Sequence, residues 1–370
     1  MSELYIGLMS GTSLDGVDGV AATFGEDGSP RVLAHACCPF DETLRQELLA
    51  LNTPGDNELH RAALAGNALA RAYADVVQRL RASLPSDAGP VRALGAHGQT
   101  VRHRPGEFDG QGYTLQLLNA ALLAELTGVD VVADLRSRDV AAGGQGAPLV
   151  PAFHAACFAR PGVWVAVLNL GGIANLSLLG PHGEVRGFDC GPGNVLLDLW
   201  CQRHLGQPYD AQGRWSAQGR VLPGLLQALE AEPWLALPPP KSTGRDLFHA
   251  DWLQARLDLL PGSAPMDVQA TLCEFTAACA ATHLQRHAPA TRELIVCGGG
   301  AFNTDLLERL RARLPGVAVL DSGQRGLPPL QVEAAAFAWL ARARLRGRPG
   351  NLPAVTGAAG PRVLGAVHHA

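Results

Sequence analysis

Apolar and polar residues alternate along the chain in two different patterns. Short apolar runs bounded by glycine and polar residues predict buried strands, and longer segments with helical periodicity predict helices. Because strands and helices follow one another in turn, the pattern predicts an α/β fold. The expected strands are 4–8, 17–24, 91–96, 129–133, 164–170, 173–179, 185–188, 293–297 and 317–320. The expected helices are 57–84, 119–126, 195–204, 266–287, 304–314 and 332–345.

The pattern begins again in the second half of the chain. Each half opens with a hairpin whose turn is small and polar, SGTSLDG in the first half and NLGGIAN in the second. A chain of 370 residues is also long for a single core. We therefore expect two similar α/β domains with a ligand cleft between them. The expected domains are residues 1–130 with 346–370, and residues 131–345.

Composition excludes several classes of function. A net charge of -4 without a basic block gives no electrostatic reason to expect nucleic-acid binding. The eight cysteines show no CxxC spacing, which indicates core thiols in a reducing cytosol rather than a metal site. The sequence opens on a strand instead of a signal peptide, and no long uncharged apolar run predicts a membrane span. We expect a cytoplasmic protein without a membrane partner.

Three glycine-containing turns are candidate phosphate or nucleotide sites. The turn GTSLDGVD, residues 11–18, can present backbone N–H groups and hydroxyls to phosphate oxygens, although an ordinary hairpin turn would have the same composition. It lacks the GK[ST] ending of a Walker A loop. The turn in NLGGIAN could clamp a triphosphate from a second side. The glycines of residues 298–300 leave room for a ribose or a flat ring, or form a plain strand-to-helix turn.

Polar residues follow two of the predicted strands, where α/β proteins place their ligands. Asp189 lies in GFDCGPGN, and the sharp loop after it would hold its carboxylate at a strand end. There it could act as a general base or cap the next helix. His97 and Thr100, in AHGQT, could hydrogen-bond a sugar or form a satisfied buried network.

Further charged residues are also candidates for the site. Arg136 and Arg138 could bind a carboxylate ligand through a guanidinium fork, or pair internally with Asp139. Glu333 begins a helix, where it could bind sugar hydroxyls or complement the helix dipole. Lys241 is the only lysine of the chain, and it could be a compact point charge near phosphate.

Nine segments, several of which contain these candidates, occur in a specific order between residues 7 and 358: GLMSGTSLDGVD, AHGQT, AAGGQGAPLVPAFH, NLGGIANLS, FDCGPGN, PKSTGRDLF, CGGGAFN, EAAAFAWLA and GNLPAVTGA. In this order the chain resembles the anhydro-N-acetylmuramic acid kinase family of the sugar kinase, Hsp70 and actin superfamily. The resemblance implies two actin-like (ribonuclease H-like) domains, ATP with Mg²⁺, a homodimer and a substrate from peptidoglycan recycling. The implied reaction opens the 1,6-anhydro ring of anhydro-N-acetylmuramic acid with water and phosphorylates O6, giving N-acetylmuramate 6-phosphate and ADP.

The resemblance also assigns roles by motif position. Asp189 would be the base that activates water for attack on the anomeric carbon. Arg138 would bind the lactyl carboxylate, and His97, Thr100 and Glu333 would belong to the sugar site. The residues expected to bind ATP are Gly11, Thr12, Ser13, Leu14, Asp15, Gly16, Val17, Asp18, Asn169, Gly171, Gly172, Gly298, Gly299, Gly300 and Asn303.

Two positions depart from what the resemblance implies. Cys190 stands where the family has a threonine after the catalytic aspartate. Met9 stands where the wider superfamily often has a metal-linked aspartate. A metal contact is therefore expected from Asp15 or Asp18, directly or through water.

Two other functions remain open at this point. One is a different sugar or acyl kinase of the same superfamily. The other is a non-enzymatic actin-like nucleotide-binding protein. The rate of turnover of the anhydrosugar relative to a common hexose would separate the first, and sedimentation with ATP would test for filaments.

Overall fold

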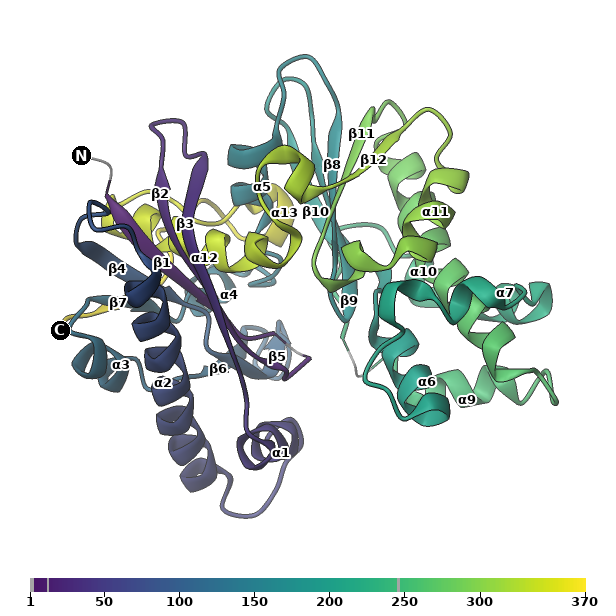
Figure 1. The fold of residues 1–370 in the computed structure, drawn as a ribbon, viewed down its shortest axis with the longest axis horizontal. Coiled ribbons are helices and arrows are strands. Elements are labelled where there is room, and N and C mark those ends of the chain that lie inside the picture. Colours follow the sequence, from purple (N-terminus) through teal and green to yellow (C-terminus); the bar gives the residue numbers. More distant parts are fainter. Residues whose placement is uncertain (1–2, 12, 245–246) are drawn as a thin grey trace. The chain divides into compact units, whose positions relative to one another are not determined.

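The computed structural model describes residues 3–11, 13–244 and 247–370 (Figure 1). It forms two compact units, residues 1–157 with 330–370, and residues 158–329. The unit boundaries therefore differ from the expected ones at 130 and 345. The reason is that β7 (Val131–Ala133) pairs with a strand of the first unit, and α12 (Val332–Leu345) packs against β1 (Leu4–Met9).

The first unit is built on a six-stranded sheet of order β13-β7-β4-β1-β2-β3. β2 is antiparallel to both β1 and β3, whereas β4 is parallel to β1 and to β7. The remaining strands of the sheet are β2 (Gly16–Phe24), β3 (Pro30–Pro39), β4 (Val91–Ala96) and β13 (Ala366–His368), and a separate hairpin consists of β5 (Gln99–Pro105) and β6 (Gly112–Leu117). The other helices of this unit are α1 (Glu42–Ala50), α2 (Glu58–Ser83), α3 (Ala120–Thr127), α4 (Ser137–Val140), α5 (Pro151–Phe158) and α13 (Pro353–Thr356).

Two helices cover the two faces of this sheet. Ile6 and Leu8 of β1 belong to the core cluster that also contains the buried residues of α2. Gly7, which faces the other way in a strand, lies against α12, where a Cβ on Gly7 would come within 1.8 Å of the Ala334 carbonyl oxygen. Gly95 of β4 meets the Phe337 carbonyl oxygen in the same way. The alanine-rich α12 and the glycines of β1 and β4 thus allow very close packing of helix on sheet.

The second unit contains a five-stranded sheet of order β10-β9-β8-β11-β12. β9 is antiparallel to β8 and β10, and β11 is parallel to β8 and β12. The strands are β8 (Val165–Leu170), β9 (Ile173–Leu179), β10 (Val185–Pro192), β11 (Glu293–Cys297) and β12 (Ala318–Asp321). The α-helices are α6 (Val195–Leu205), α7 (Pro223–Glu230), α8 (Pro233–Ala236), α9 (Ala250–Leu257), α10 (Pro265–His287) and α11 (Thr304–Arg313). Short 3₁₀ turns are η1 (Ala211–Gly213), η2 (Ser216–Gln218), η3 (Gly299–Phe302), η4 (Ser322–Arg325) and η5 (Pro329–Gln331), the last of which crosses the unit boundary.

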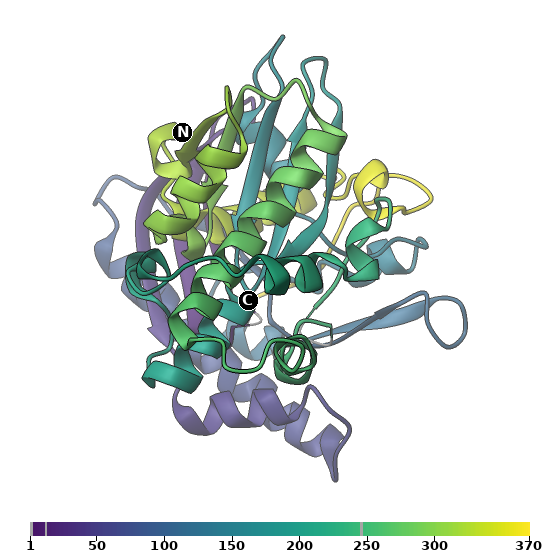
Figure 2. The same ribbon diagram turned by 90° about the vertical axis from the view of Figure 1, so that its right-hand side faces the viewer.

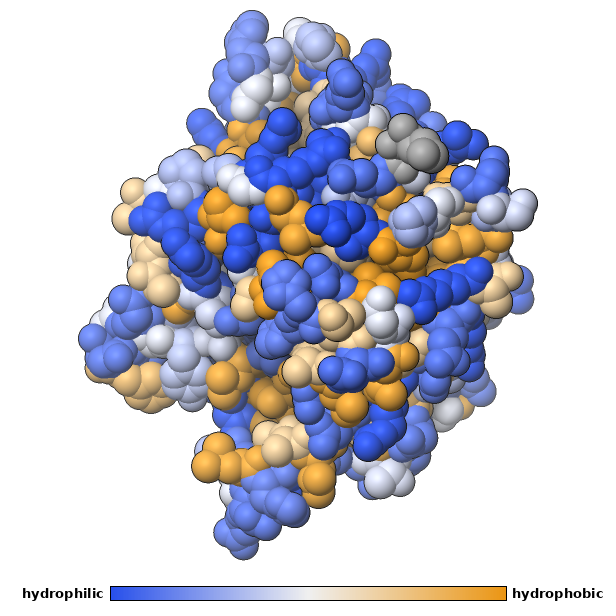
Figure 3. Space-filling view, turned by 90° about the vertical axis from the view of Figure 1, so that its left-hand side faces the viewer, coloured by the Kyte–Doolittle hydropathy of each residue, from blue (hydrophilic) through white to orange (hydrophobic). Residues whose placement is uncertain are grey.

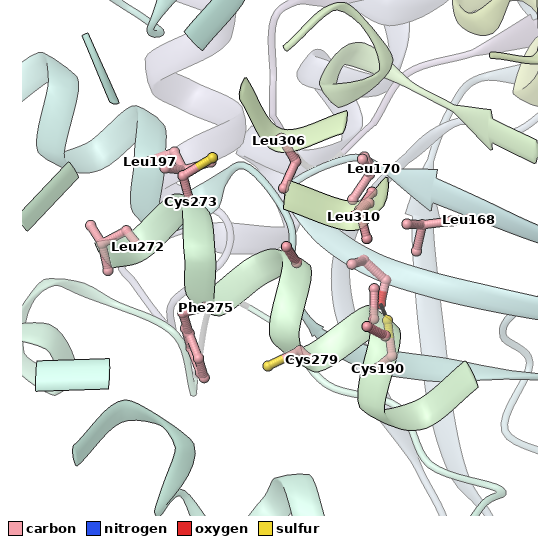
Figure 4. Packing of buried hydrophobic residues seen from close by; sticks show 14 of the residues in the cluster. Leu168, Leu170, Cys190, Leu197, Leu272, Cys273, Phe275, Cys279, Leu306 and Leu310 are labelled. Carbon is pink, nitrogen blue, oxygen red and sulfur yellow. Dashed lines mark hydrogen bonds between the residues drawn. The ribbon is translucent and has the colours of Figure 1, made fainter. Parts of the chain in front are cut away.

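The core of the second unit lies between its sheet and two long helices. α10 and α11 lie over the sheet in Figure 2. Figure 4 shows residues of α10, including Phe275 and Cys279, together with Leu310 of α11 and Leu168 of β8. These residues are almost fully buried and belong to one contiguous apolar cluster.

The two units repeat the same topology. The order β3-β2-β1-β4-β7 in the first corresponds to β10-β9-β8-β11-β12 in the second, with the same parallel and antiparallel pairs. This is the actin-like, ribonuclease H-like arrangement, so the predicted fold class is confirmed. Each of the expected strands and helices is present, and the two echoed hairpins are β1–β2 and β8–β9.

The surface has no large uniform apolar region in the view of Figure 3. Apolar residues form several separate groups among hydrophilic ones there, as is usual for protein surfaces. Over residues 3–11, 13–244 and 247–370, no helix combines the length and apolar character needed to cross a membrane.

Candidate active site

Backbone hydrogen bonds join described residues of the turn between β1 and β2 to one another and to the end of β3. The Leu14 N–H donates to the Gly11 carbonyl at 3.2 Å, and the Asp15 carbonyl accepts from the Phe40 N–H at 3.1 Å. A Cβ on Gly16 would lie 2.3 Å from the Cys38 carbonyl oxygen, so only glycine fits there. The expected ATP-binding residues of this hairpin lie on this turn and at the start of β2, except that Thr12 lies outside the described residues, and their role toward ATP stays a prediction.

Buried polar groups of the AHGQT segment form hydrogen bonds with the start of the same turn. The Gln99 amide nitrogen donates to the Gly11 carbonyl at 3.1 Å, and His97 Nδ1 lies 3.1 Å from the Ser10 carbonyl oxygen. The Ser10 hydroxyl donates to the Gly98 carbonyl at 3.0 Å and accepts from the Tyr73 hydroxyl at 2.8 Å. These hydrogen bonds fix Ser10 and Gly11 at the start of the turn.

The surroundings of His97 in the structure do not allow its ring to contact a sugar directly. Its side chain is buried, with 6% exposed, and Arg136 donates to its Nε2 from Nε at 3.1 Å and from Nη2 at 2.9 Å. Both ring nitrogens are therefore engaged by the protein. Of the two interpretations of the AHGQT cluster, the satisfied buried network is the one observed for His97.

Burial of two histidines makes stability depend on pH. Burial lowers the pKa of His97 and of His154 to about 3, with the Arg136 charge adding to the effect at His97. The folded state keeps both rings neutral, whereas the unfolded chain binds their protons below about pH 6.5. Stability is thus full above about pH 6.5 and falls as the pH drops toward 3, by roughly 2 kcal/mol per histidine at about pH 5. Urea unfolding midpoints at about pH 7.5 and 5 measure this loss, and equal midpoints would contradict it.

Arg136 and Asp139 organise the glycine-rich loop that follows α4. Arg136 Nη1 donates to the Gly146 carbonyl at 2.8 Å, and the Gly146 N–H donates to Asp139 Oδ2 at 2.7 Å. The other oxygen of Asp139 accepts from the Asn351 amide at 2.6 Å and from the Thr356 hydroxyl at 2.8 Å. The segments AAGGQG and GNLPAVTGA, which are far apart in sequence, therefore meet at one buried carboxylate.

The other expected sugar-binding residues all belong to the first unit. Arg138 lies on α4 and is exposed. Thr100 lies on β5, where its hydroxyl accepts from the Gln116 amide at 3.2 Å. Glu333 lies in the first turn of α12, directly before Ala334, which touches β1. Their roles toward a sugar stay predictions.

Asp189 lies at a β-bulge near the carboxyl end of β10. It pairs with Asn175 of β9, while Gly191 pairs with Ala174, so Cys190 is the extra residue. The Asp189 carboxylate accepts from the Thr243 N–H at 2.9 Å. The N-cap of α6 is Asn194, so Asp189 does not cap that helix. The bulge therefore presents the carboxylate at a strand end, as the sequence predicts.

Cys190 replaces the threonine of the resemblance without exposing a reactive group. Its side chain is fully buried, and its thiol donates to the Ala174 carbonyl at 3.3 Å. Burial raises the pKa of this thiol well above its ordinary value, so it stays protonated. The donor that a threonine hydroxyl would supply is thus retained.

Lys241 does not act as a free charge near phosphate, and the prediction for it is wrong. Its Nζ donates to His283 Nε2 at 2.9 Å and to the Leu235 carbonyl at 3.0 Å, and it lies 4.2 Å from the centre of the Trp234 ring. Burial lowers the pKa of this amine. The lysine fixes the segment before Thr243, while Arg245 and Asp246 of the same motif lie outside the described residues.

The glycine turns of the second unit converge on one another. The N–H groups of Gly193 and Asn194 donate to the carbonyls of Gly172 and Gly171 at 2.9 and 2.8 Å. A Cβ on Gly300 would lie 2.5 Å from Leu170 Cβ and 3.0 Å from the Asn194 side-chain oxygen. Asn303 caps α11 by accepting from the Leu306 N–H at 3.0 Å. The turns around 171–172 and 298–300 are therefore neighbours, as a shared nucleotide site would need.

Gly298 gives a sharp test of this packing. Its φ is +78°, and a Cβ would lie 2.5 Å from Asn169 Oδ1 and 2.8 Å from the Leu170 carbonyl oxygen. Gly298→Ala is expected to cost about 2–4 kcal/mol of stability and to weaken ATP binding. Gly299→Ala is the matched control for stability, because Gly299 has an ordinary φ and its Cβ would come no closer than 3.8 Å to Asn194 Nδ2. Thermal unfolding of both variants checks the loss of stability, and equal losses would contradict it. ATP titration of Gly298→Ala checks the weaker binding.

Over residues 3–11, 13–244 and 247–370, no three His, Cys, Asp or Glu side chains form a group that could hold a metal ion. Mg²⁺ needs no such group, because it commonly binds one or two carboxylates together with substrate phosphates and waters. Met9 pairs with Asp18 across the β1–β2 ladder, so their side chains share one face of the sheet. Asp18 is about half exposed and lies 3.5 Å from His35, and Asp15 is exposed on the turn. The residues therefore fit a cation carried by nucleotide phosphates.

Comparisons with known proteins find one family over nearly the whole chain. A family model described as anhydro-N-acetylmuramic acid kinase matches residues 3–370. Proteins named anhydro-N-acetylmuramic acid kinase from Variovorax paradoxus (strain S110) and Cupriavidus metallidurans are 66% and 57% identical, and the alignments cover 100% and 99% of this chain and 99% and 98% of those proteins.

Solved structures resemble this chain more distantly. The activator of the 2-hydroxyisocaproyl-CoA dehydratase from Clostridium difficile with bound ADPNP has a TM-score of 0.48 at 11% identity, over 93% of this chain and 96% of that one. A ROK family glucokinase from Streptomyces griseus in complex with glucose and AMPPNP has a TM-score of 0.38 at 16% identity, over 92% and 99% of the two chains. The match to the family therefore rests on the sequence comparisons and not on these structural likenesses.

Proposed function

The chain belongs to the anhydro-N-acetylmuramic acid kinase family, and on this premise we propose that it uses ATP and water to convert 1,6-anhydro-N-acetylmuramic acid into N-acetylmuramate 6-phosphate and ADP. The family match covers residues 3–370. The observation that carries the proposal is the bulge that holds Asp189 at the end of β10. A carboxylate there, in a sugar kinase that must also add water, has the role of a base.

The proposed reaction needs one base and one phosphoryl acceptor. Water attacks the anomeric carbon, and Asp189 takes its proton. The bond between the anomeric carbon and O6 breaks, O6 takes the γ-phosphoryl group, and ADP leaves. Phosphoryl transfer then depends on positioning and charge neutralisation rather than on a covalent enzyme group. A single carboxylate suffices, whereas a retaining glycosidase uses two.

Sugar recognition is proposed for three residues of the first unit. Arg138 is exposed on α4 and offers a guanidinium fork that suits the lactyl carboxylate. Thr100 and Glu333 supply a hydroxyl and a carboxylate for the hydroxyl and N-acetyl groups of the sugar. His97 is not included among the direct contacts, because both its ring nitrogens bind protein groups.

Nucleotide binding is proposed for the turns of the β1–β2 and β8–β9 hairpins and for the glycines of residues 298–300. Mg²⁺ would neutralise charge on the transferred phosphoryl group. Of the two candidate carboxylates, Asp18 is favoured over Asp15, because Asp18 faces the position of Met9 across the ladder. A carboxylate at residue 18 can thereby take the metal-binding role that a carboxylate at residue 9 often has in the superfamily.

An isotope experiment tests the proposed reaction. The enzyme is given ATP, Mg²⁺ and the anhydrosugar in ¹⁸O-water, and the phosphosugar is analysed by mass spectrometry. We expect one ¹⁸O at the anomeric carbon and none between O6 and phosphorus. Product without label at the anomeric carbon would rule out attack by water. Faster turnover of a common hexose than of the anhydrosugar would favour another kinase of the superfamily.

Two further properties stay predictions. The family resemblance implies a homodimer, and the cysteine pattern favours a cytoplasmic location. Sedimentation velocity with and without ATP measures the first, and it also tests for actin-like filaments. Fractionation of cells that produce the protein measures the second.

A further inference from the structure

His97 lies between two segments that the proposed function uses, and the inference below rests on that function. On one side is the phosphate hairpin, defined here as residues 10–18. On the other is the arginine segment, defined as residues 136–146, which carries Arg138 and the glycine-rich loop. His97 contacts the Ser10 carbonyl of the first and the Arg136 guanidinium of the second.

These two contacts fix the protonation of the ring. A carbonyl oxygen can only accept, so Nδ1 must carry the hydrogen that it donates to Ser10 at 3.1 Å. A guanidinium can only donate, so Nε2 must offer its lone pair to Arg136 at 2.9 Å. His97 is therefore a neutral Nδ1–H tautomer, and each of its two nitrogens serves a different segment.

Arg136 extends the connection through the arginine segment. Its Nη1 donates to the Gly146 carbonyl at 2.8 Å, which closes the loop after α4. The Gly146 N–H in turn donates to the buried Asp139 carboxylate at 2.7 Å. Arg138 lies on α4 between Arg136, the N-cap residue, and Asp139, and both of these residues are hydrogen-bonded to Gly146.

We propose that His97 is the positioning residue that holds the phosphate hairpin and the arginine segment in one fixed arrangement. It touches neither substrate. Its Nδ1–H sets the turn that binds nucleotide phosphates, and its Nε2 sets the guanidinium that shapes the sugar-carboxylate site. Loss of the Ser10 contact affects ATP more than the sugar, and loss of the Arg136 contact affects the sugar more than ATP.

A pair of substitutions separates the two contacts. In His97→Asn the side-chain amide can occupy the place of Nδ1, so it keeps the bond to Ser10 and loses the bond to Arg136. In His97→Gln the longer side chain can place its oxygen near Nε2, so it keeps Arg136 and releases Ser10. We expect His97→Gln to raise the KM for ATP roughly tenfold with the KM for the anhydrosugar within about twofold, and His97→Asn to do the reverse. His60→Asn, at an exposed position of α2, is the control and should match the wild type.

The outcomes are decisive in each case. Equal changes in both KM values for the two variants, or no change in either, would overturn the proposal. If both variants fail to fold, ¹⁵N spectra of wild-type histidine side chains provide the test. A neutral Nδ1–H ring for His97 supports the proposal, and an Nε2–H or doubly protonated ring at about pH 7 overturns it. Because ATP binding can be titrated without sugar, a failure of the proposed reaction in the wild type would remain distinguishable from a failure of this proposal.

Discussion

Replacement of Asp189 by asparagine is expected to lower kcat by about 10³-fold while leaving the affinity for ATP within about twofold. An amide cannot take the proton of the attacking water, so the proposed base is lost. The local structure should persist, because the asparagine oxygen can still accept from the Thr243 N–H, which lies 2.9 Å from the carboxylate. Release of ADP that depends on the anhydrosugar measures kcat, and calorimetric titration measures ATP binding.

Asp251→Asn is the matched control for this prediction. Asp251 is exposed in the first turn of α9, in the same unit, so its replacement removes a carboxylate without touching β10. Turnover by Asp251→Asn should stay close to that of the wild type. If Asp189→Asn retains more than about a tenth of wild-type turnover, Asp189 is not the base.

The fold could be predicted because its determinants are local. Periodicity along the chain located the strands of the two sheets except β3 and β13, and the repeated small, polar turns revealed the duplication. The unit boundaries could not be found in this way. β7 pairs with β4 and α12 packs on β1, and both partners lie far away in sequence. Pairing over such distances is set by tertiary packing, which periodicity does not contain.

The side-chain contacts of the site also depend on tertiary packing that the sequence pattern does not contain. Residue type and motif position were enough to place Asp189 at a strand end, but the bulge at Cys190 and the Thr243 contact depend on pairing with β9 and on a distant loop. The prediction for Lys241 was wrong because a sequence does not show where a side chain points. In the structure its amine points toward His283.

The network beneath the phosphate hairpin was only partly visible in the sequence. A histidine in AHGQT can contact a sugar or belong to a buried network, and its two partners in the structure decide for the network. The role of Asp139 was missed, although the segments AAGGQG and GNLPAVTGA were both recognised. The available signal was that two glycine-containing segments with polar residues needed a common partner, and Asp139 stands two residues before the first of them.

Asp139→Ala is expected to give the largest loss of stability among these changes, because the carboxylate is fully buried and accepts three hydrogen bonds. Its removal leaves the Gly146 N–H, the Asn351 amide and the Thr356 hydroxyl without this acceptor. At about 1–3 kcal/mol for each buried donor that stays unsatisfied, we expect a loss of roughly 3–6 kcal/mol, which is a large part of the stability of an ordinary domain. Thermal unfolding followed by circular dichroism measures the loss.

The segments in which Asp139→Ala loses protection distinguish a local role of Asp139 from general destabilisation. Hydrogen exchange should become faster in residues 143–146 and 351–356, which the carboxylate joins, and should stay unchanged in β8 and β9 of the second unit. Asp87→Ala, at an exposed position between α2 and β4, is the control and should change the stability by less than about 0.5 kcal/mol. An Asp139→Ala protein as stable as Asp87→Ala would show that the two segments hold their places without the carboxylate. In that case the glycine-rich loop, rather than Asp139, would set the position of Arg138.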